Sequence, residues 1–509
     1  MIKISNNSFV LMTTLLYAGF IIFISSFHVV WRNEVVPMTV ASQSTSLMDL
    51  FSKIHSFGHP FLWYFLLYLV HQVIHPYWVL KLVNLSICIA AIFIFLANAP
   101  FSRLVKVLFV LGFFPLYLYP VINCNYGISM LLLFAFAAVY PQRFEKIILL
   151  GFILFLLACA HAHSLITVMG ISLALMAELI FSPSSRQAWQ VNLNRTILGF
   201  AIILGGILLS AFLTIPDHDN IILDPHPLGH QVVIMAFIKS LILPGKAFSS
   251  VLGFPSALFP SAAVLFIYAY FLNRPYLLIF FAMGVVGLSI FYHLIFFSDE
   301  MRHQGALYLL IITVFWLESY QPTVKLGKIS GRIQKFVAPY SQAFLIFLLV
   351  LQIGMSLAAI KKEMTTVYSS SKSLGILINH NPIYKKAVLI GEPGAMVEAL
   401  PYYSDNTIYL PREGSFNKYT QFNKNQKSQY CMTDLLKVSH VIKTMTGKPV
   451  LIIMGHKLSL NGPYQVKFSH GRSFTYTRES LVNFYAQTIK VASFDKAVTD
   501  ENYGVYLLK

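Results

Sequence analysis

Charged residues are scarce in this chain. They make up 11% of its 509 residues, whereas about a quarter of the residues in a soluble domain carry charge. Hydrophobic residues make up 57%, and the mean hydropathy is +0.67. This balance excludes an ordinary soluble protein and predicts an α-helical polytopic membrane protein that contacts membrane lipids.

Acidic residues and known catalytic motifs are also in short supply. The chain has 20 acidic and 37 basic residues, a net charge of +17. No long run of Lys or Arg occurs, so the basic residues suit loops that orient a membrane protein, and we expect no nucleic-acid partner. The chain lacks a Gly-rich phosphate loop, a His-Glu-x-x-His helix, a Cys-x-x-Cys pair and a Gly-x-Ser-x-Gly turn. Their absence argues against ATP-driven transport and zinc hydrolysis.

The charge that is present divides the chain in two. Residues 361–509 hold 19 of the 37 basic and 10 of the 20 acidic residues. We therefore predict a membrane domain over 1–360 and a soluble domain over 361–509. Of the four cysteines, only Cys431 lies in the soluble part, so no disulfide can form within it.

Long apolar runs predict the membrane spans. The first, Phe9 to Val30, is too long for a signal peptide core and predicts a retained helix. The other candidate spans lie near 60–75, 77–97, 104–122, 126–140, 147–181, 196–215, 247–271, 276–297, 304–320 and 342–360. The stretch 147–181 is interrupted by polar residues and should form two helices, and 231–243 could add a short one. We expect about 11–13 transmembrane helices.

Basic loops predict the orientation of the C-terminal half. Arg274 and the cluster from Lys325 to Lys335 mark cytoplasmic loops, so the helix at 342–360 delivers the soluble domain to the outside. In the N-terminal half, the basic loops around Arg103 and Arg143 do not fit the parity of the predicted helices. One predicted boundary in that half must therefore be wrong.

Two segments outside the spans have a recognisable pattern. In the first external loop, 31–58, Leu47, Leu50, Phe51 and Ile54 recur at helical spacing and predict an amphipathic surface helix, which could equally serve only to cap the bundle. In the soluble domain, apolar runs at 387–390, 407–410 and 449–454 predict strands. The segment 432–445 predicts a helix, so we expect an extracytoplasmic α/β domain. The Ser run at 369–371 is typical of a linker.

Polar residues near the predicted external ends of the spans are candidates for function, because charge at membrane depth is costly. They are Glu34, Asp49, His59, His161, His163, Asp299, Glu300, Arg302 and His303. An acid, several imidazoles and an arginine at the same depth in the bilayer suit the transfer of a group from an anionic lipid headgroup. The carboxylate would accept a proton, and the arginine would bind the phosphate.

Each candidate also has a structural explanation. Glu34 could form an exposed ion pair with Arg32, and Asp49 could be solvated. His161 and His163 are two residues apart, which on a helix places them on different faces and argues against a shared metal. They could instead be hydrogen-bonded residues at a helix break. Arg302 and His303 could anchor the helix end at the membrane interface.

Several segments together resemble the GT-C glycosyltransferases of bacteria, a superfamily of multi-spanning enzymes that includes protein O-mannosyltransferases and aminoarabinose transferases. The resemblance lies in Trp31-Arg32-Asn33-Glu34, Ser46-Leu47-Met48-Asp49-Leu50-Phe51, Gly58-His59-Pro60-Phe61-Leu62-Trp63-Tyr64, Asn125-Tyr126-Gly127, Ala160-His161-Ala162-His163 and Arg302-His303-Gln304-Gly305. It covers most of the membrane part. The first-loop acid combined with Gly-His-Pro is its most specific piece.

The resemblance implies a glycosyltransferase in the bacterial inner membrane that moves a sugar from a polyprenyl-phosphate carrier to an extracytoplasmic glycan, lipid or protein. Glu34 matches the second residue of the family's Asp-Glu pair and would be the catalytic base, whereas Asn33 replaces the first and cannot accept a proton at neutral pH. A divalent metal ion is the one cofactor that the family suggests, with its ligands unassigned.

The implied substrate-binding residues are Asn33, His59, Asn125, His161, His163, Arg302 and His303. The alternatives are a transporter or flippase for a lipid-linked glycan and a non-catalytic homologue.

Overall fold

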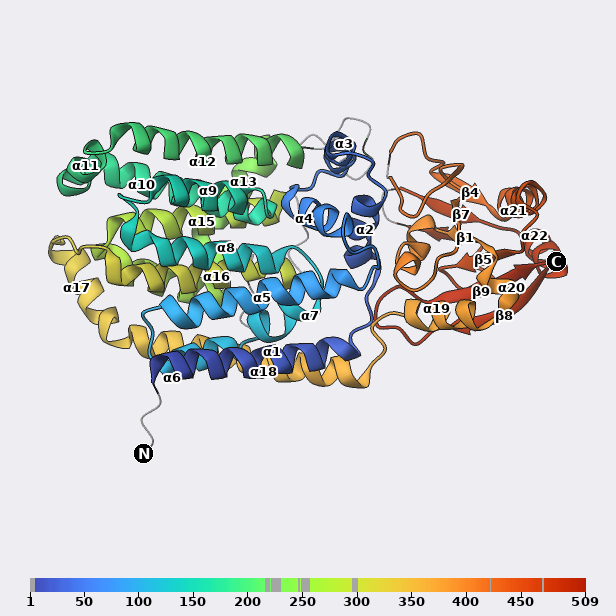
Figure 1. Ribbon diagram of the computed structural model, residues 1–509, viewed down its shortest axis with the longest axis horizontal. Coiled ribbons are helices and arrows are strands. Elements are labelled where there is room, and N and C mark those ends of the chain that lie inside the picture. Colours follow the sequence, from blue (N-terminus) through green and yellow to red (C-terminus); the bar gives the residue numbers. More distant parts are fainter. Residues whose placement is uncertain are drawn as a thin grey trace.

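The structure is a computed structural model that describes residues 5–215, 220, 230–245, 248, 257–294, 301–421, 423–468 and 471–509. Figure 1 shows a bundle of roughly parallel helices, with the C-terminal domain attached at one end and the N-terminus at the other. We call the end next to the C-terminal domain the domain end of the bundle.

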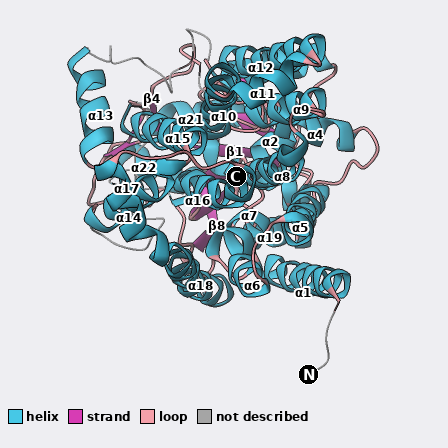
Figure 2. Cartoon of the chain, turned by 90° about the vertical axis from the view of Figure 1, so that its left-hand side faces the viewer, coloured by secondary structure: helices cyan, strands magenta, loops and turns pink. Residues whose placement is uncertain are grey.

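The helices of the bundle are α1 (Asn6–Phe27), α2 (Arg32–Ser42), α3 (Leu47–Phe57), α4 (Leu62–His71), α5 (Val79–Asn98), α6 (Arg103–Val110), α7 (Tyr119–Val121), α8 (Tyr126–Val139), α9 (Ile147–Ala158), α10 (Ala162–Phe181), α11 (Pro183–Gln190), α12 (Leu193–Thr214), α13 (His230–Ile242), α14 (Leu258–Tyr270), α15 (Pro275–Leu294), α16 (Met301–Leu317), α17 (Lys328–Val337) and α18 (Ser341–Thr365). Helix α16 is buried along almost all of its length, and the view along the bundle places it inside (Figure 2).

Six helical segments in the described part of the chain are long and apolar enough to cross a membrane. They are Asn6–Phe27, Val79–Asn98, Ala162–Phe181, Leu193–Thr214, Pro275–Leu294 and Lys328–Thr365. A seventh would be the pair Arg103–Val110 and Phe114–Val121, which is bent by 51°. Five further apolar helices have only 10–17 residues. A membrane protein with several spans is therefore supported, whereas the count of 11–13 stays a prediction.

Helix α4 explains why the N-terminal half did not fit the charge rule. A span was predicted at 60–75, but α4 has ten residues, about 15 Å, half of the hydrocarbon thickness that a span must cover. It lies beside α2 at the domain end (Figure 1). With α4 removed from the crossings, the start of α6, at Arg103, and the loop after α8, which carries Arg143, fall at the far end of the bundle, together with α17 (Figure 1).

The stretch 147–181 forms two helices, as predicted, and the carbonyl groups at the break are satisfied by neighbouring elements. The carbonyl of Ala158 accepts from the Ser210 hydroxyl at 2.7 Å, and that of Cys159 accepts from the Leu62 amide at 3.1 Å. The carbonyl of Ala160 accepts from Asn125 Nδ2 at 2.9 Å. Because exposed carbonyl groups are costly at membrane depth, these three contacts fix the position of the break.

The first loop folds into α2 and α3, which lie between the bundle and the C-terminal domain (Figure 1). The amphipathic helix predicted there corresponds to α3. Its Leu50 and Ile54 are buried, whereas Leu47 is exposed. The hydrophobic face is thus narrower than the sequence pattern indicated.

The C-terminal domain contains the predicted α/β fold. Its six-stranded sheet has the order β3-β2-β1-β5-β9-β8, and a three-stranded sheet has the order β4-β7-β6. The strands are β1 (Val388–Glu392), β2 (Ile408–Leu410), β3 (Ser415–Phe416), β4 (Gln429–Cys431), β5 (Val450–Met454), β6 (Gln465–Lys467), β7 (Ser473–Thr475), β8 (Thr488–Phe494) and β9 (Tyr503–Leu508). The helices are α19 (Ser371–His380), α20 (Pro382–Lys385), α21 (Met432–Thr446) and α22 (Arg478–Gln487).

Strands β1 and β5 are the centre of the larger sheet. They pair in parallel, with Ile390 opposite Ile452, and every residue of both strands is buried. Such strands are covered on both faces and read as continuous apolar runs, which is why the sequence revealed them. The Ser run at 369–371 is not a free linker as predicted, because its Ser369 and Ser371 are buried and both donate to Glu501 Oε2.

Candidate functional site

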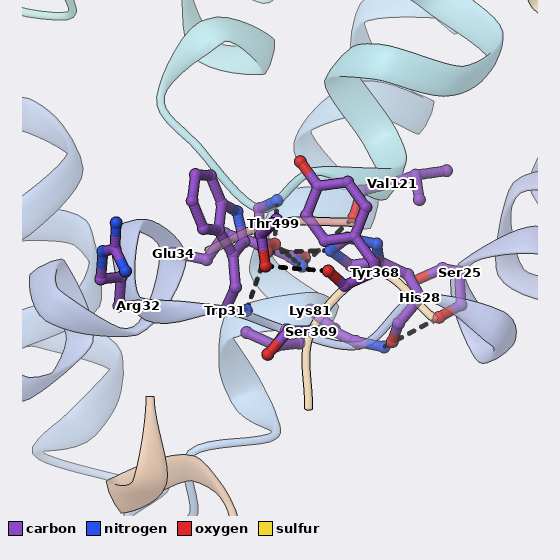
Figure 3. A network of polar contacts seen from close by, with 12 residues as sticks. Ser25, His28, Trp31, Arg32, Glu34, Lys81, Val121, Tyr368, Ser369 and Thr499 are labelled. Atoms are coloured by element: carbon purple, nitrogen blue, oxygen red, sulfur yellow. Dashed lines mark hydrogen bonds and ion pairs between the residues drawn. The ribbon is translucent and has the colours of Figure 1, made fainter. Parts of the chain in front are cut away.

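Two polar clusters lie at the domain end of the bundle. The first surrounds Glu34, which is fully buried. Its Oε1 accepts from the Trp31 amide at 3.2 Å and lies 2.9 Å from His28 Nε2. Its Oε2 accepts from the amide and from Nδ2 of Asn123, both at 2.6 Å. We call these residues, with Glu363, the Glu34 cluster (Figure 3).

His28 links the N-terminal and C-terminal parts of the membrane domain. Its Nδ1 lies 3.0 Å from Glu363 Oε1, so the imidazole bridges the first-loop carboxylate and one at the end of α18. Burial by itself would lower the pKa of His28, but Glu34 and then Glu363 outweigh it and raise this pKa to about 9. The imidazolium therefore neutralises part of the charge of two buried carboxylates. Lys81 adds a second cation and donates to the carbonyls of Ser25 and His28 (Figure 3).

Glu34 also begins a helix. Its carboxylate accepts from the amide of Trp31, the residue that caps α2, and so satisfies an amide group at the start of that helix. The predicted ion pair of Glu34 with Arg32 is wrong. Arg32 instead forms an ion pair with Asp500 at 2.7 Å, and its amide donates to Glu501 Oε1 at 2.9 Å. The first loop is thereby tied to the C-terminal domain.

These contacts weigh against two roles expected for Glu34. Four donor groups already occupy its oxygens, so a reacting hydroxyl or a metal ion would have to displace some of them. Asn33, which replaces the family's first acid, is exposed. The role of Glu34 as base stays a prediction, and the geometry favours a residue that positions the loop.

The second cluster consists of His161, His163 and His303, which we call the histidine cluster. Each residue has a ring nitrogen within 4.8 Å of the others. The rings of His161 and His163 stack with centroids 4.2 Å apart, and His163 stacks on His303 at 5.2 Å. His161 and His163 also form a short contact through their Nδ1 atoms.

The argument that residues two apart cannot share a metal is wrong for this pair. His161 does not lie on the helix: it is the residue that caps α10, with extended backbone at φ −160° and ψ 153°. Its ring folds back over the first turn, where its Nδ1 accepts from the His163 amide at 3.2 Å. The helix break thus brings both imidazoles to the same side of α10, where their rings stack.

The loop before α8 connects the two clusters. Asn123 binds Glu34, whereas Asn125 binds the carbonyl of Ala160 at the helix break. Tyr126 contacts His303 Nδ1 through its hydroxyl at 3.0 Å, and its ring lies 4.9 Å from that of His161. Four consecutive residues therefore set the positions of an acid, a helix break and an imidazole.

Two further predicted residues lie beside the histidine cluster. Arg302 is half-buried, with its guanidinium 5.9 Å from the centre of the Trp31 ring. His59 is exposed and stacks on Tyr64 with centroids 6.2 Å apart. It lies close enough to His303 and His161 for their charges to interact. Asp49 is instead bound to Lys53 at 2.9 Å on α3, whereas Asp299 and Glu300 lie outside the described residues.

A small cavity opens on the histidine cluster. Its volume is about 20 Å³, and its lining includes the hydroxyls of Ser129, Ser164 and Thr167 together with the three histidines. Such a volume holds about one water molecule or ion. Three nitrogen donors and a cavity of this size could hold a metal ion, and Arg302 next to it could hold an anion.

Comparisons with known proteins do not identify the chain. No protein-family model matches it, and no curated protein matches it. The resemblance to the GT-C glycosyltransferases therefore rests on the motifs alone.

Sequence reasoning missed His28, Lys81, Asn123 and Glu363. Two of them had a signal: His28 lies near the end of the first apolar run, Phe9 to Val30, and Glu363 lies in the last turns of the last apolar helix. Polar residues at such positions often have a buried partner. The partner itself is 335 residues away in sequence, and no spacing rule reveals it.

Proposed function

We propose that this protein is an integral-membrane glycosyltransferase of the GT-C kind, which moves a sugar from a polyprenyl-phosphate carrier to an extracytoplasmic acceptor. It would cross the bacterial inner membrane with 11–13 helices and carry its C-terminal domain on the outside. The observation that supports the proposal most is the gathering of Arg302, His59 and the histidine cluster at the domain end. These residues come from three segments far apart in the sequence, at 59, 161–163 and 302–303.

This gathering suits a phosphate that leaves. In the proposed step, the acceptor hydroxyl attacks the anomeric carbon, the bond from that carbon to the phosphate oxygen breaks, and the carrier phosphate departs with the electron pair. Arg302 keeps its positive charge at any working pH and presents paired N–H donors to phosphate. Donors that meet the charge as it develops lower the barrier most.

The acceptor must also lose a proton. Glu34 remains the base implied by the family, but it would first have to release a donor. We propose instead that the departing phosphate oxygen, which takes the electron pair, accepts this proton. Glu34 then positions the first loop and, through Asn123, the loop that carries Tyr126. Under this assignment the charge of Glu34 matters less to turnover than the charge of Arg302.

The proposal is tested in cells that lack the gene and carry wild type, Arg302→Ala, Glu34→Gln or Arg186→Ala at matched membrane levels. Arg186 is an exposed arginine of α11 at the far end of the bundle and serves as the control. We expect the deletion and Arg302→Ala to lose the same sugar from the profile of surface glycans, and Arg186→Ala to keep it. A deletion that leaves every surface glycan unchanged would contradict the proposal.

A transporter is the main rival. It needs a polar path, yet Glu178 and Glu318, which the sequence placed within the spans, form ion pairs with Arg143 at 2.6 Å and with Arg274 at 3.1 Å. The discriminating assay adds purified protein in detergent to lipid-linked sugars extracted from the deletion strain. A transferase consumes them and modifies an added envelope acceptor, whereas a transporter acts only across an intact bilayer.

A further inference from the structure

We propose that His161, His163 and His303 bind a divalent transition-metal ion, with Zn²⁺ as the best match. The inference rests on the geometry of the cluster and does not depend on the proposed transferase activity. It differs from the family expectation, in which the first-loop acid helps to hold a metal.

The identity of the donors selects the metal. Imidazole nitrogen suits Zn²⁺, Cu²⁺, Ni²⁺ and Fe²⁺, whereas Mg²⁺ and Ca²⁺ prefer oxygen. Three protein nitrogens with a fourth position left open are typical of Zn²⁺ sites that bind water or a substrate atom. The Glu34 cluster is a poorer candidate for a metal site, because the oxygens of its carboxylate are already bound by N–H groups.

The spacing is close to that of a bound site. With Zn–N distances of 2.0–2.1 Å, two nitrogens of a tetrahedral site lie about 3.3 Å apart. The ring nitrogens here lie within 4.8 Å of one another. Binding therefore requires a local adjustment of the three imidazoles toward this separation, which rotation of their side chains can supply.

The backbone holds the three ligands ready. His161 is fixed as the cap of α10 and His163 lies in the first turn of the same helix. His303 lies in the first turn of α16, the helix inside the bundle. Because the break before α10 is fixed by contacts from three other elements, the two helix starts are presented to each other by a rigid frame.

A second layer of polar contacts orients the ligands. Metal-bound histidines usually engage their other ring nitrogen with a polar partner, and His303 Nδ1 lies 3.0 Å from the Tyr126 hydroxyl. The carbonyl of His303 accepts from the Tyr292 hydroxyl. Next to the rings, the Ser164 hydroxyl donates to that of Ser129 at 2.7 Å, in the lining of the cavity.

The cavity supplies the fourth position. It has room for about one water molecule or ion, and Ser129, Ser164 and Thr167 are among the residues that line it. Three neutral imidazoles leave a bound ion with its double positive charge, so an anion such as hydroxide or a phosphate oxygen is the expected fourth ligand. Arg302, which directly precedes His303 in the first turn of α16, would favour the same anion.

The test measures metal content rather than activity. Full-length protein is purified in mild detergent, treated with a chelator, dialysed against Zn²⁺ and then against metal-free buffer, and analysed by mass spectrometry for metals. We expect about one Zn²⁺ per chain for wild type and a background level for His163→Ala and for His303→Gln. Glutamine can keep a hydrogen bond to Tyr126, which guards against a variant that fails to fold.

Matched controls come from a second pair of neighbouring histidines. His71 and His75 lie 5.2 Å apart by ring centroid and are more accessible to solvent. Replacing both with Ala should leave the metal content unchanged. Tyr126→Phe should keep the metal but weaken its binding by about 10–100-fold, as loss of an orienting partner does at other metal sites.

Loading with Co²⁺ gives a second readout that does not depend on the amount of contaminating zinc. We expect visible absorption bands of tetrahedral cobalt in wild type and in the His71→Ala/His75→Ala variant, and none in His163→Ala. Equal metal content in wild type, His163→Ala and His303→Gln would overturn the proposal. So would metal that is lost in Glu34→Gln but kept in His163→Ala, because the ion would then belong to the Glu34 cluster.

Discussion

The Glu34 cluster and the histidine cluster lie at the same end of the bundle and share one connecting loop, yet they differ in how their polar groups are balanced. In the Glu34 cluster, two carboxylates meet an imidazolium, and each oxygen of Glu34 has two donors. In the histidine cluster, three imidazoles stack on one another beside a cavity.

The difference separates structure from function. A buried carboxylate whose oxygens are all bound by donors, as in Glu34, rigidifies the fold and has little capacity left for a ligand. A set of basic nitrogens around an open volume still has that capacity. Burial and charge alone would mark both clusters as functional candidates, and only the partners of each atom distinguish them.

Removing Glu34 should have the largest effect on stability. Glu34→Ala leaves His28 and the two Asn123 donors buried without their acceptor, and breaking a buried ion pair in this way costs about 3–5 kcal/mol. His303→Gln should cost only about 1 kcal/mol, since it replaces one hydrogen-bonding side chain with another. Both are measured as thermal unfolding midpoints in detergent.

The unfolding midpoints of Glu34→Ala and His303→Gln test the distinction between the two clusters. If Glu34→Ala unfolds at the wild-type temperature but abolishes sugar transfer, then Glu34 is a catalytic residue and the distinction between the clusters fails. If both variants are destabilised equally, the histidine cluster is a structural element as well.

The second prediction concerns pH. The pKa of His28 is raised to about 9 in the folded protein, compared with about 6.5 in an unfolded chain. Its contribution to stability is therefore complete below about pH 6.5 and is lost as the pH rises to about 9, a change of a few kcal/mol. Unfolding midpoints between pH 6 and 9.5 should fall in wild type and fall less in Glu34→Gln. Parallel curves would contradict the buried ion pair.

Close packing beside the histidine cluster gives the third prediction. A Cβ atom at Gly305 would lie 2.5 Å from Phe114 Cε1 and closer still to the Tyr119 hydroxyl, so Gly305→Ala should cost about 1–3 kcal/mol. It should also weaken Zn²⁺ binding by displacing His303. Gly354→Ala is the matched control, because nothing lies within 4 Å of its Cβ. That change should stabilise α18 by about 0.5–1 kcal/mol. A Gly305→Ala protein that unfolds no earlier than Gly354→Ala would show that packing around His303 is loose.

Much of the fold follows from the sequence because its signals are local. Strands β1 and β5 are apolar throughout, the helix at 432–446 begins and ends near the predicted bounds, and the polar break before α10 lies inside an apolar run. The error at α4 has a physical cause as well. Its ten apolar residues satisfy a hydropathy window together with their neighbours, but the helix ends before it can cross.

The site could be predicted only in part. The sequence singled out His161, His163, Arg302 and His303 as polar residues at the ends of apolar runs, and the structure gathers them at one end. It could not reveal that His161 lies off the helix axis as a cap, because that depends on contacts made by Leu62, Asn125 and Ser210. Contacts between elements that are distant in sequence decide which polar residues face one another.

The smallest effect is expected where the Glu34 cluster meets the C-terminal domain. Arg32 forms its ion pair with Asp500, whose side chain is 57% exposed, and such surface pairs contribute about 0–1 kcal/mol. Arg32→Ala should hardly change the rate at which a protease cleaves between α18 and α19. Glu501 differs, because it is fully buried and accepts from the Arg32 amide and from two serines. Glu501→Ala should therefore speed cleavage at that junction several-fold. Equal cleavage rates in the two variants would show that the buried acid holds the domain to the bundle no better than the surface ion pair does.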